Sequence, residues 1–455
     1  MALTDAASER GQFSSRFGFI AAATGSAVGL GNIWGFPTQT ASHGGGAFVL
    51  AYLILTFLLA YPALMAELII GRHTRHNMVG ALPELTKKPA LKIIGRVTGF
   101  YGVAIASLIL SFYTIVAGWL MAQVPAALAG INSQVPTTSW LSESSLLRDS
   151  LFCGVFSLLT ASIVARGVKE GIERWSTRLM PALVLLMLGL VATVLTLPGA
   201  MEGLRLYLVP NFSVITDPGL LTGAMGQAFF SLSLGVGTML IYGSYVSKAD
   251  NLPLTGAYVA LIDTGIAFLA GLLIIPALFV AQYQGIEIYN SDNTLIAGPD
   301  LILQTLPSLF NSLGIVGGFI GLVFFLLLTI AALTSSISML EVPVTFVLET
   351  FKTSRSRATW LVGVIIFGLS LLILNNFDLL FAGVISFTTK YSQPLLGVML
   401  CLFAGWVLHR NKLLKEISTG FTGAKDSLFW KIWPGYIRFV CPLLIILMFV
   451  QNVRS

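Results

Sequence analysis

The chain contains a series of apolar runs, each about 20 residues long, which is the length that a helix needs to cross a bilayer. Roughly eleven runs follow one another, centred near Val28, Thr56, Ile109, Phe156, Leu186, Gly235, Ala270, Phe325, Phe367, Ser392 and Ile445. Only 10% of the residues are charged, against about 25% in soluble proteins. These features predict an all-α polytopic membrane protein and exclude an ordinary water-soluble protein.

Lysine and arginine residues gather in alternate connectors between the runs. They are Arg10 and Arg16; Arg72, Arg75, Lys87, Lys88, Lys92 and Arg96; Arg166, Lys169, Arg174 and Arg178; Lys248; Lys352, Arg355 and Arg357; Arg410, Lys412, Lys415, Lys425 and Lys431. By the positive-inside rule, we expect a multi-pass protein of the cell membrane with its N-terminus in the cytoplasm and its C-terminus outside. Because the basic residues alternate with the spans, they indicate topology in a lipid bilayer and no nucleic-acid partner.

The first apolar run is interrupted in its middle. Residues 25–32 read GSAVGLGN and combine three glycines with a serine and an asparagine. Each glycine costs a helix interior roughly 1 kcal/mol relative to alanine, and non-helical backbone is tolerated at membrane depth only where protein or a cavity surrounds it. The stretch predicts a helix broken at mid-membrane, as in secondary transporters. The alternative is a continuous helix whose glycines allow close packing.

A second run of small and polar residues, SLSLGVG at 231–237, lies in the sixth span. Two matched breaks, five helices apart, predict a five-plus-five inverted repeat in which helices 1 and 6 face each other at the bilayer centre. We expect one transmembrane domain over 1–455, with repeats at about 17–198 and 220–405 and an additional helix 11 at about 428–450.

Polar side chains inside the spans are costly, and each requires a partner. Asn32 follows the first break, Asp263 lies in the seventh span, and Thr334 and Ser335 lie near the middle of the eighth. Their oxygens suit a hard alkali cation better than a transition metal. The alternative for serine and threonine is a hydrogen bond to the preceding helical turn. Tyr113, in the third span, is either an amphipathic core residue or a phenol that binds a ligand.

Four motifs resemble the neurotransmitter sodium symporter family in its bacterial amino-acid branch. They are GSAVGLGNIWGFP (25–37), GGGAF (44–48), GQAFFSLSLGVG (226–237) and LTSSISMLE (333–341). The resemblance extends from Arg10 to about Gly435 and implies a fold of the leucine-transporter type. It also implies sodium-driven amino-acid symport by alternating access.

Carried over onto this sequence, the resemblance implies two sodium sites and a substrate site. The first sodium site (Na1) would comprise the Ala27 carbonyl, the side chains of Asn32, Ser231 and Asp263, and the substrate carboxylate. The second (Na2) would comprise the carbonyls of Gly25, Val28 and Ala331 and the hydroxyls of Thr334 and Ser335. The substrate carboxylate would meet the amides at Leu30 and Gly31 and the Tyr113 hydroxyl. Its amino group would meet the carbonyls of Ala27, Phe230 and Ser233.

The implied side-chain pocket is lined by Ile109, Val116, Phe230, Val236, Ser335 and Met339. It holds no charge, and Val236 replaces a bulkier phenylalanine of relatives, so we expect hydrophobic L-amino acids up to the size of tryptophan. Gly29 replaces the aspartate of monoamine transporters, which favours a substrate with its own carboxylate. Asp263 stands where many members have asparagine, and Ala267 where chloride-dependent members have serine. We therefore expect no chloride requirement.

The resemblance also implies moving parts. An inner gate on the cytoplasmic side would comprise Arg10, Phe13, Ser244, Tyr245 and Glu349. Gly171 and Pro181 fit the family's Gly-x9-Pro pattern at the start of the fifth span. Because proline removes a helical hydrogen bond and glycine lowers the cost of unwinding, we expect this segment to unwind and to admit water to Na2.

Together these features predict a sodium-coupled symporter that imports hydrophobic amino acids. Proton coupling on the same fold is the alternative, with Asp263 or Glu67 as the proton carrier. Glu67 is otherwise interpreted as an interfacial charge, because it lies just before Gly71 and Arg72. A channel would need a continuous polar stripe along several helices and an enzyme would need a catalytic constellation, and the sequence contains neither pattern.

Overall fold

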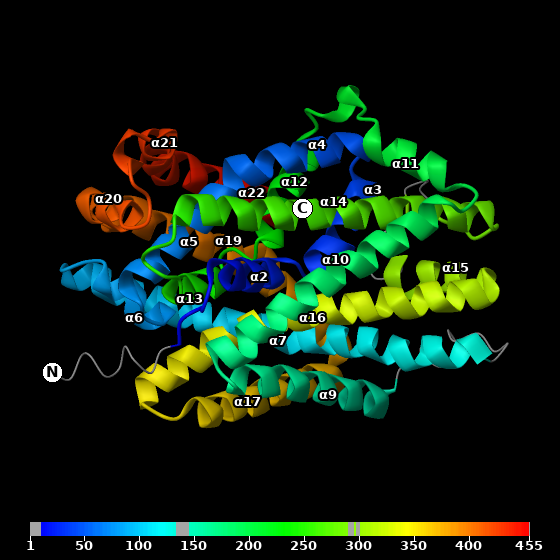
Figure 1. The fold of residues 1–455 in the computed structure, drawn as a ribbon, viewed down its shortest axis with the longest axis horizontal. Helices are drawn as coiled ribbons and strands as arrows, with labels where there is room; N and C mark the ends of the chain where they lie inside the picture. The colour runs from blue at the N-terminus through cyan, green and yellow to red at the C-terminus, as the bar shows by residue number, and fades with distance from the viewer. Residues whose placement is uncertain (1–10, 133–144, 290–294, 297–300, 455) are drawn as a thin grey trace.

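The fold is a bundle of long helices, seen in a computed structural model that describes residues 11–132, 145–289, 295–296 and 301–454. Within these residues the extended pairing consists of two isolated bridges, Gly45 with Pro210 and Tyr289 with Leu295. The predicted all-α class is therefore confirmed. Figure 1 shows the long helices running in the same general direction, with α2 near the middle of the bundle.

The first five spans are built from helices with short π-helical turns (η) between them. They are α2 (Arg16–Ala27), η1 (Gly31–Gly35) and α3 (Phe36–Ser42); α4 (Gly46–Leu55), η2 (Thr56–Ala60) and α5 (Tyr61–Thr74); α7 (Pro89–Asn132); α9 (Leu146–Ala165); and η3 (Val168–Glu173) with α10 (Arg174–Leu195). The short helix α6 (Met78–Glu84) connects the second span to the third.

The remaining spans follow two short connecting elements, α11 (Ala200–Leu208) and the 3-10 turn η4 (Phe212–Val214). They are α12 (Pro218–Ser231) with α13 (Thr238–Ser244); α14 (Leu252–Tyr283); α16 (Gly314–Phe351); α17 (Arg355–Asn375); α18 (Phe377–Ile385), η6 (Ser386–Ser392), α19 (Gln393–Leu402) and η7 (Phe403–Val407); and α21 (Leu428–Gly435), η9 (Tyr436–Val440) and α22 (Cys441–Arg454). The connectors contain η5 (Leu301–Thr305), α15 (Leu306–Ser312), α20 (Arg410–Ser418) and the 3-10 turn η8 (Ala424–Asp426).

Among the described residues, eight helices are long and apolar enough to cross a membrane, and up to ten spans result if each of two bent pairs counts as one. One of these pairs is α2 with η1 and α3, which meet at an angle of 54°. Helices α12 and α13 are separated by residues 232–237 and form one further broken span, which completes the expected set of about eleven.

The first helix is broken where the backbone becomes extended at Val28. Helix α2 runs from Arg16 to Ala27, and the side chain of Ser15 caps its start by accepting a hydrogen bond from the amide of Gly18. Val28 is extended (φ −70°, ψ 102°), and helical structure resumes at Gly31 as a π-helical turn. The predicted interruption is confirmed.

The second break contains left-handed backbone at Ser233 (φ 52°), Gly235 (φ 71°) and Gly237 (φ 83°). Only glycine adopts this region at low cost. At Gly235 a side chain is excluded twice, because a Cβ atom would also lie 2.2 Å from the carbonyl oxygen of Gln393. The glycines of the SLSLGVG motif therefore allow the backbone between α12 and α13 to adopt a non-helical conformation.

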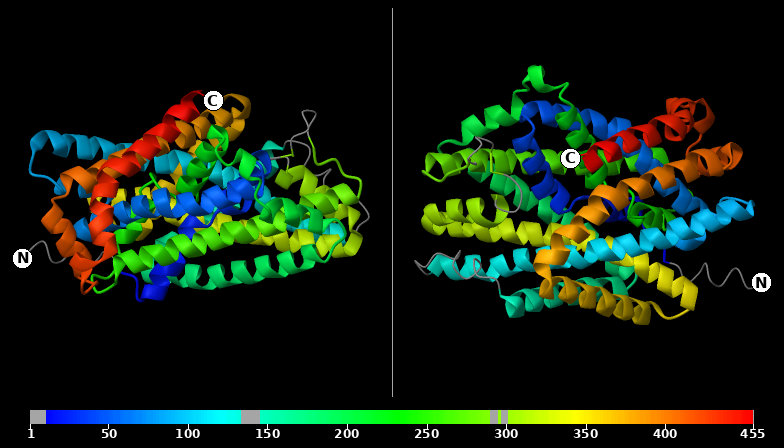
Figure 2. Two further views of the ribbon diagram at one scale, coloured as in Figure 1. Left: turned by 90° about the horizontal axis from the view of Figure 1, so that it is seen from above. Right: turned by 180° about the vertical axis from the view of Figure 1, so that it is seen from behind.

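The four half-helices lie together. Helix α12 contacts η1 and α3, while α13 contacts α2. Helices α10, α14 and α16 also pack against α2, and α16 packs along α7. The two breaks, far apart in sequence, therefore meet inside the bundle. Figure 2 shows α22, in red, beside α19 on the outer side of the bundle.

Candidate substrate and ion site

Three predicted Na1 residues form one buried cluster between the breaks and α14. The Asn32 Nδ2 atom donates to Ser231 Oγ at 2.8 Å and to Asp263 Oδ1 at 2.7 Å. The Ser231 hydroxyl donates to Asp263 Oδ2 at 2.6 Å, and Tyr52 lies 3.2 Å from Ser231 Oγ. All four side chains are at most 1% exposed. Ala27, the last residue of α2, is also buried.

The predicted Na2 residues also converge. The Ser335 hydroxyl on α16 lies 3.4 Å from the Gly25 carbonyl oxygen and 3.2 Å from that of Val28. The Thr334 hydroxyl donates to the Ala331 carbonyl of the preceding turn at 3.0 Å, which is the hydrogen bond expected under the alternative interpretation. A Cβ atom at Gly25 would lie 3.3 Å from Thr334 Cβ, so the end of α2 closely approaches α16. The contacts place hydroxyl and carbonyl oxygens side by side, which is the donor set of a hard cation.

Tyr113 on α7 lies beside the first break. The amide of Leu30, at the end of the first break, donates to the Tyr113 hydroxyl at 3.3 Å. A Cβ atom at Gly29 would lie 2.5 Å from Ser335 Oγ and 3.0 Å from the Tyr113 hydroxyl. The phenol of Tyr113 therefore belongs to the buried core and also directs its hydroxyl toward the broken backbone.

The predicted pocket residues lie on α7, α12 and α16, except Val236, which lies in the second break. Ile109, Val116, Val236 and Met339 are buried, and Ser335 lies one turn before Met339 on α16. Phe230 differs from them, because 39% of its surface is exposed. A Cβ atom at Gly31 would lie 2.8 Å from the Phe230 ring, so this ring covers the second half of the first break.

Hydrogen bonds between the two breaks involve residues that the sequence did not single out. The Ser26 carbonyl accepts from Ser233 Oγ at 3.0 Å and from Ser335 Oγ at 3.2 Å. The Ser26 hydroxyl donates to Ser338 Oγ at 2.7 Å. The Gln227 amide group donates to the Gly31 carbonyl at 2.7 Å. Freed backbone carbonyls are thus satisfied by side chains of the opposite broken helix and α16.

Glu67 is not the interfacial charge that its position suggested. It is 2% exposed, and its Oε1 atom accepts from the amide of Gly235 in the second break at 2.7 Å. The Gln393 side chain donates to the Leu234 carbonyl at 2.8 Å. Buried polar groups need partners. Glu67 in the second span and Gln393 in the tenth span are the partners of the backbone groups of the second break. The signal in the sequence was the intramembrane position of each polar residue.

Two of the predicted inner-gate residues, Phe13 and Tyr245, lie together near the start of the described chain. The amide of Phe13 donates to the Tyr245 carbonyl at 3.3 Å, and its ring packs edge-on against Phe19, Tyr242 and Tyr245. The Tyr245 hydroxyl donates to Glu341 at 2.6 Å, and Glu341 is paired with Arg355. The sequence analysis missed this pair, although Glu341 ends one of the recognised motifs.

Two other gate residues, Glu349 and Ser244, form hydrogen bonds within the described part of the chain. Glu349 accepts from the backbone amide of Asn77 at 3.0 Å and from its side chain at 2.7 Å. Ser244 donates to the Ile241 carbonyl within its own helix. Arg10, the expected partner of Glu349, lies outside the described residues.

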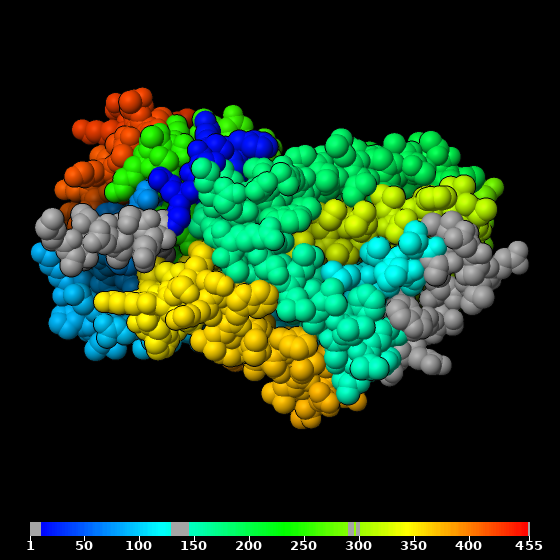
Figure 3. Space-filling view, turned by 60° about the horizontal axis from the view of Figure 1, so that its bottom comes forward, coloured from blue at the N-terminus to red at the C-terminus, as the bar shows by residue number. Residues whose placement is uncertain are grey.

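The predicted unwinding segment is wound in this structure. Residues 168–173 form the π-helical turn η3, which continues into α10, and Pro181 lies inside that helix. A Cβ atom at Gly171 would lie 2.1 Å from the Ile163 carbonyl, so glycine permits close contact with α9. Glu173 accepts from the amide and hydroxyl of Ser14, at 2.8 and 2.6 Å. Figure 3 shows the dark blue start of the described chain against the blue-green η3 and α10.

Comparisons with known proteins decide the family. The model of the sodium:neurotransmitter symporter family matches residues 10–143 and 143–455. The chain belongs to the sodium:neurotransmitter symporter family. The sequence is 36% identical to the uncharacterized sodium-dependent transporter YhdH of Bacillus subtilis, with 97% of each chain covered. It is 34% identical to an uncharacterized sodium-dependent transporter of Haemophilus influenzae, with 98% of each chain covered.

A solved structure of this symporter family confirms the fold. The crystal structure of MhsT in complex with L-phenylalanine matches with a TM-score of 0.84 and 38% sequence identity, over 97% of this chain and all of that one. The expected fold of the leucine-transporter type, with helices 1 and 6 broken, is therefore confirmed. The protein is a sodium-dependent membrane transporter and not an enzyme.

Proposed function

We propose that this symporter imports hydrophobic L-amino acids, both aliphatic and aromatic, with sodium and without chloride. The substrates would be leucine, isoleucine, valine, phenylalanine, tyrosine and tryptophan. The observation that carries the proposal is the position of the Tyr113 hydroxyl at the first break, beside Gly29, whose amide donates to Asn32 and whose Cβ position lies close to Ser335. A substrate carboxylate bound there would lie close to both groups of oxygens.

Na1 would form where Asn32, Ser231 and Asp263 meet, with the Ala27 carbonyl and the substrate carboxylate completing it. In the structure, Asn32 presents Nδ2 to the other two side chains, and its Oδ1 accepts from the amide of Gly29 at 3.3 Å. A half-turn of the Asn32 amide group exchanges these atoms and directs its oxygen toward Asp263. A carboxylate, an amide oxygen and a hydroxyl then suit sodium.

Na2 would form from the carbonyls of Gly25, Val28 and Ala331 and the hydroxyls of Thr334 and Ser335. A bound cation would take the place of the hydrogens that these hydroxyls donate to the carbonyls. Because Ser335 contacts the end of α2, sodium at Na2 would hold the first broken helix against α16. Loss of this sodium would release α2, which is the step that alternating access requires.

The substrate site would lie between the breaks. The amides of Leu30 and Gly31 would bind the carboxylate together with Tyr113, because they lie at the N-terminal end of a half-helix, where anions are favoured. The carbonyls of Ala27, Phe230 and Ser233 would bind the amino group. The buried apolar residues Ile109, Val116, Val236 and Met339 would surround the side chain. L-Phenylalanine in the related crystal structure of MhsT supports this substrate class.

The fixed carboxylate of Asp263 supports chloride independence. It lies within hydrogen-bonding distance of Asn32 and Ser231, so it supplies negative charge directly at the proposed cation. We also place the protein in the cell membrane with a cytoplasmic N-terminus. The repeats would span about 17–198 and 220–405, followed by helix 11 at about 428–450.

Uptake into proteoliposomes tests the proposed function. Radiolabelled leucine and tryptophan should accumulate when sodium is higher outside than inside, and equally well with chloride or gluconate as the anion. A pH gradient without sodium should drive no accumulation. Accumulation driven by protons alone would instead support the alternative, in which Asp263 or Glu67 carries the proton.

A further inference from the structure

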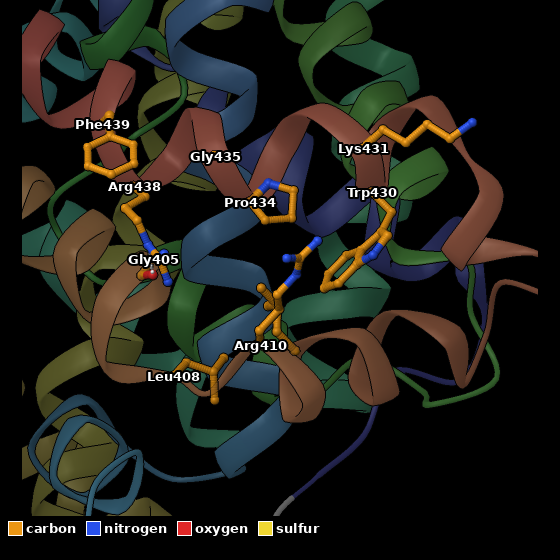
Figure 4. A pocket seen from close by; sticks show the side chains of 10 residues that line it. Gly405, Leu408, Arg410, Trp430, Lys431, Pro434, Gly435, Arg438 and Phe439 are labelled. Carbon is orange, nitrogen blue, oxygen red and sulfur yellow. Dashed lines mark hydrogen bonds between the residues drawn. The ribbon is translucent and has the colours of Figure 1, made fainter.

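A cavity of about 240 Å³ lies outside the transport site, between the ends of the tenth and eleventh spans. Its walls come from η7, α20, α21 and η9. Figure 4 shows the Arg410 side chain extending into it from α20, toward Trp430 and Pro434, while Arg438 approaches Gly405. None of the residues assigned to substrate or sodium lines this cavity.

The cavity is strongly basic. Arg410, Lys431 and Arg438 line it, and none of the described lining residues is acidic. A nearby carboxylate, Glu416 on α20, is buried and is engaged by Arg72 at 2.8 Å. Burial raises the pKa of Glu416, but hydrogen bonding to His73 and the charge of Arg72 outweigh this effect and lower it. Glu416 is therefore neutralised by other cations and does not compensate the cavity.

Aromatic rings hold two of the cations in place. The Arg410 guanidinium lies 5.5 Å from the centre of the Trp430 ring, and that of Arg438 lies 4.9 Å from the centre of the Trp406 ring. The Arg438 Nε atom also donates to the Gly405 carbonyl at 2.9 Å. Arginine held in this way loses little entropy when it binds an anion, and its planar group matches phosphate oxygens.

The surface beside the cavity is apolar and exposed. Trp406 is 56% exposed, Ile432 59% and Phe439 60%. These residues lie on the outer side of the tenth and eleventh spans, where tryptophan marks the level of lipid headgroups. A bound molecule thus meets cations at one end and an apolar surface at the other.

We propose that this cavity binds the phosphodiester headgroup of an anionic phospholipid, with an acyl chain along Phe439 and Trp406. Basic pockets at the ends of membrane helices favour such headgroups. Figure 1 shows α20 and α21 at the same end of the bundle as α6, the connector between the second and third spans. In the proposed orientation, the lipid therefore belongs to the cytoplasmic leaflet. The proposal of a headgroup site does not depend on which substrate or coupling ion the transporter uses.

The bound lipid would join the tenth span to the eleventh through α20. The amphipathic helix α20 buries Leu413 and Ile417 and exposes Lys412 and Lys415. Figure 4 shows the exposed Lys431 side chain directed away from Arg410, so Lys431 would turn toward a headgroup bound at Arg410 and thereby bridge α20 to α21. A free phosphate offers the same charge but gains nothing from the apolar surface, so we expect it to compete poorly.

Native mass spectrometry of the detergent-purified protein tests the proposal. Phosphatidylglycerol and phosphatidylcholine with the same acyl chains are titrated separately, and the fraction of protein carrying one lipid is measured. The test variant replaces Arg410 and Lys431 with glutamine. The matched control replaces Lys412 and Lys415 with glutamine, which removes the same charge from exposed positions that do not line the cavity. Sodium-dependent substrate binding by each variant reports that it is folded.

We expect phosphatidylglycerol to bind more tightly than phosphatidylcholine, and the Arg410→Gln, Lys431→Gln variant to lose roughly 20-fold in affinity for phosphatidylglycerol. The control variant should lose less than about threefold. Glycerol 3-phosphate at millimolar concentration should leave the lipid bound. Equal losses of affinity in both variants would overturn the proposal, because the lipid would then be attracted by general positive charge. Displacement of the lipid by glycerol 3-phosphate would also overturn it, because the apolar surface would then contribute nothing to binding.

Discussion

Replacing Gly29 with alanine adds one methyl group at the point where the proposed sodium and substrate sites meet. The Cβ atom would lie 2.5 Å from Ser335 Oγ and 3.0 Å from the Tyr113 hydroxyl. The backbone at Gly29 does not have a positive φ, so alanine meets no conformational penalty there. The effect of this substitution therefore comes from contacts with the two hydroxyl groups.

The size of the effect follows from the distances. A carbon atom 2.5 Å from an oxygen is closer than any normal contact, so Ser335 must turn away or α16 must shift. Inserting a methyl group into a packed interior costs about 1–3 kcal/mol. If this cost destabilises only the leucine-bound state, the affinity for leucine falls about 5- to 150-fold. Because Ser335 would also leave Na2, the sodium concentration needed for half-maximal binding should rise.

Equilibrium binding of radiolabelled leucine to purified protein, titrated with sodium, measures both effects. Gly265→Ala is the matched control, because a Cβ atom at position 265 on α14 meets nothing within 4 Å. The control should bind leucine and sodium as the unaltered protein does. Unchanged leucine affinity and sodium dependence in Gly29→Ala would refute the placement of Ser335 and Tyr113 at the binding site.

Three further outcomes are expected. Val236→Phe should lower tryptophan affinity relative to leucine by about tenfold, because a larger side chain fills the pocket; equal relative affinities in competition binding would contradict this. Pro181→Ala should slow sodium release by up to about 100-fold, since the wound form of α10 gains about 3 kcal/mol; an unchanged rate of sodium release in stopped-flow measurements would disprove the unwinding. Asp263→Asn should make uptake depend on chloride, and uptake by the unaltered protein should not; a steep chloride dependence of the unaltered protein would count against the role of Asp263.

The broken helices could be predicted from the sequence because backbone chemistry alone signals them. Glycine, serine and asparagine at 25–32 are poor choices for a membrane helix, and the structure contains an extended Val28 in that stretch. Gly235 shows the limit of this reasoning. The sequence indicates a break there, but the close approach of the Gln393 carbonyl, which excludes any side chain, depends on packing.

The clusters at Asn32 and Ser335 were predicted from the family resemblance, and their spatial convergence depends on the fold. Composition indicated only that each polar residue needs a partner. Asn32 and Asp263 are 231 positions apart in the sequence, and no local pattern connects them. The fold brings them together because η1 contacts both α12 and α14.

Glu67 and Arg355 have buried partners that their positions in the sequence did not indicate. Glu67 lies near basic residues in sequence, yet α5 continues to Thr74 and keeps Glu67 within the bundle, against the second break. Arg355 was counted as a basic connector residue, but it begins α17 and folds back to Glu341 on α16. A charge at a helix end can point inward, and only the neighbouring helices determine whether it does.

The central claim is that sodium and a hydrophobic amino acid bind together between the two breaks. Equilibrium binding of radiolabelled tryptophan and leucine to purified protein, in sodium buffer and with potassium in its place, tests it most directly. Saturable binding of both amino acids in sodium, and of neither in potassium, is the predicted result. Binding that is the same in both buffers would contradict the claim, because the carboxylate would then not share its site with sodium.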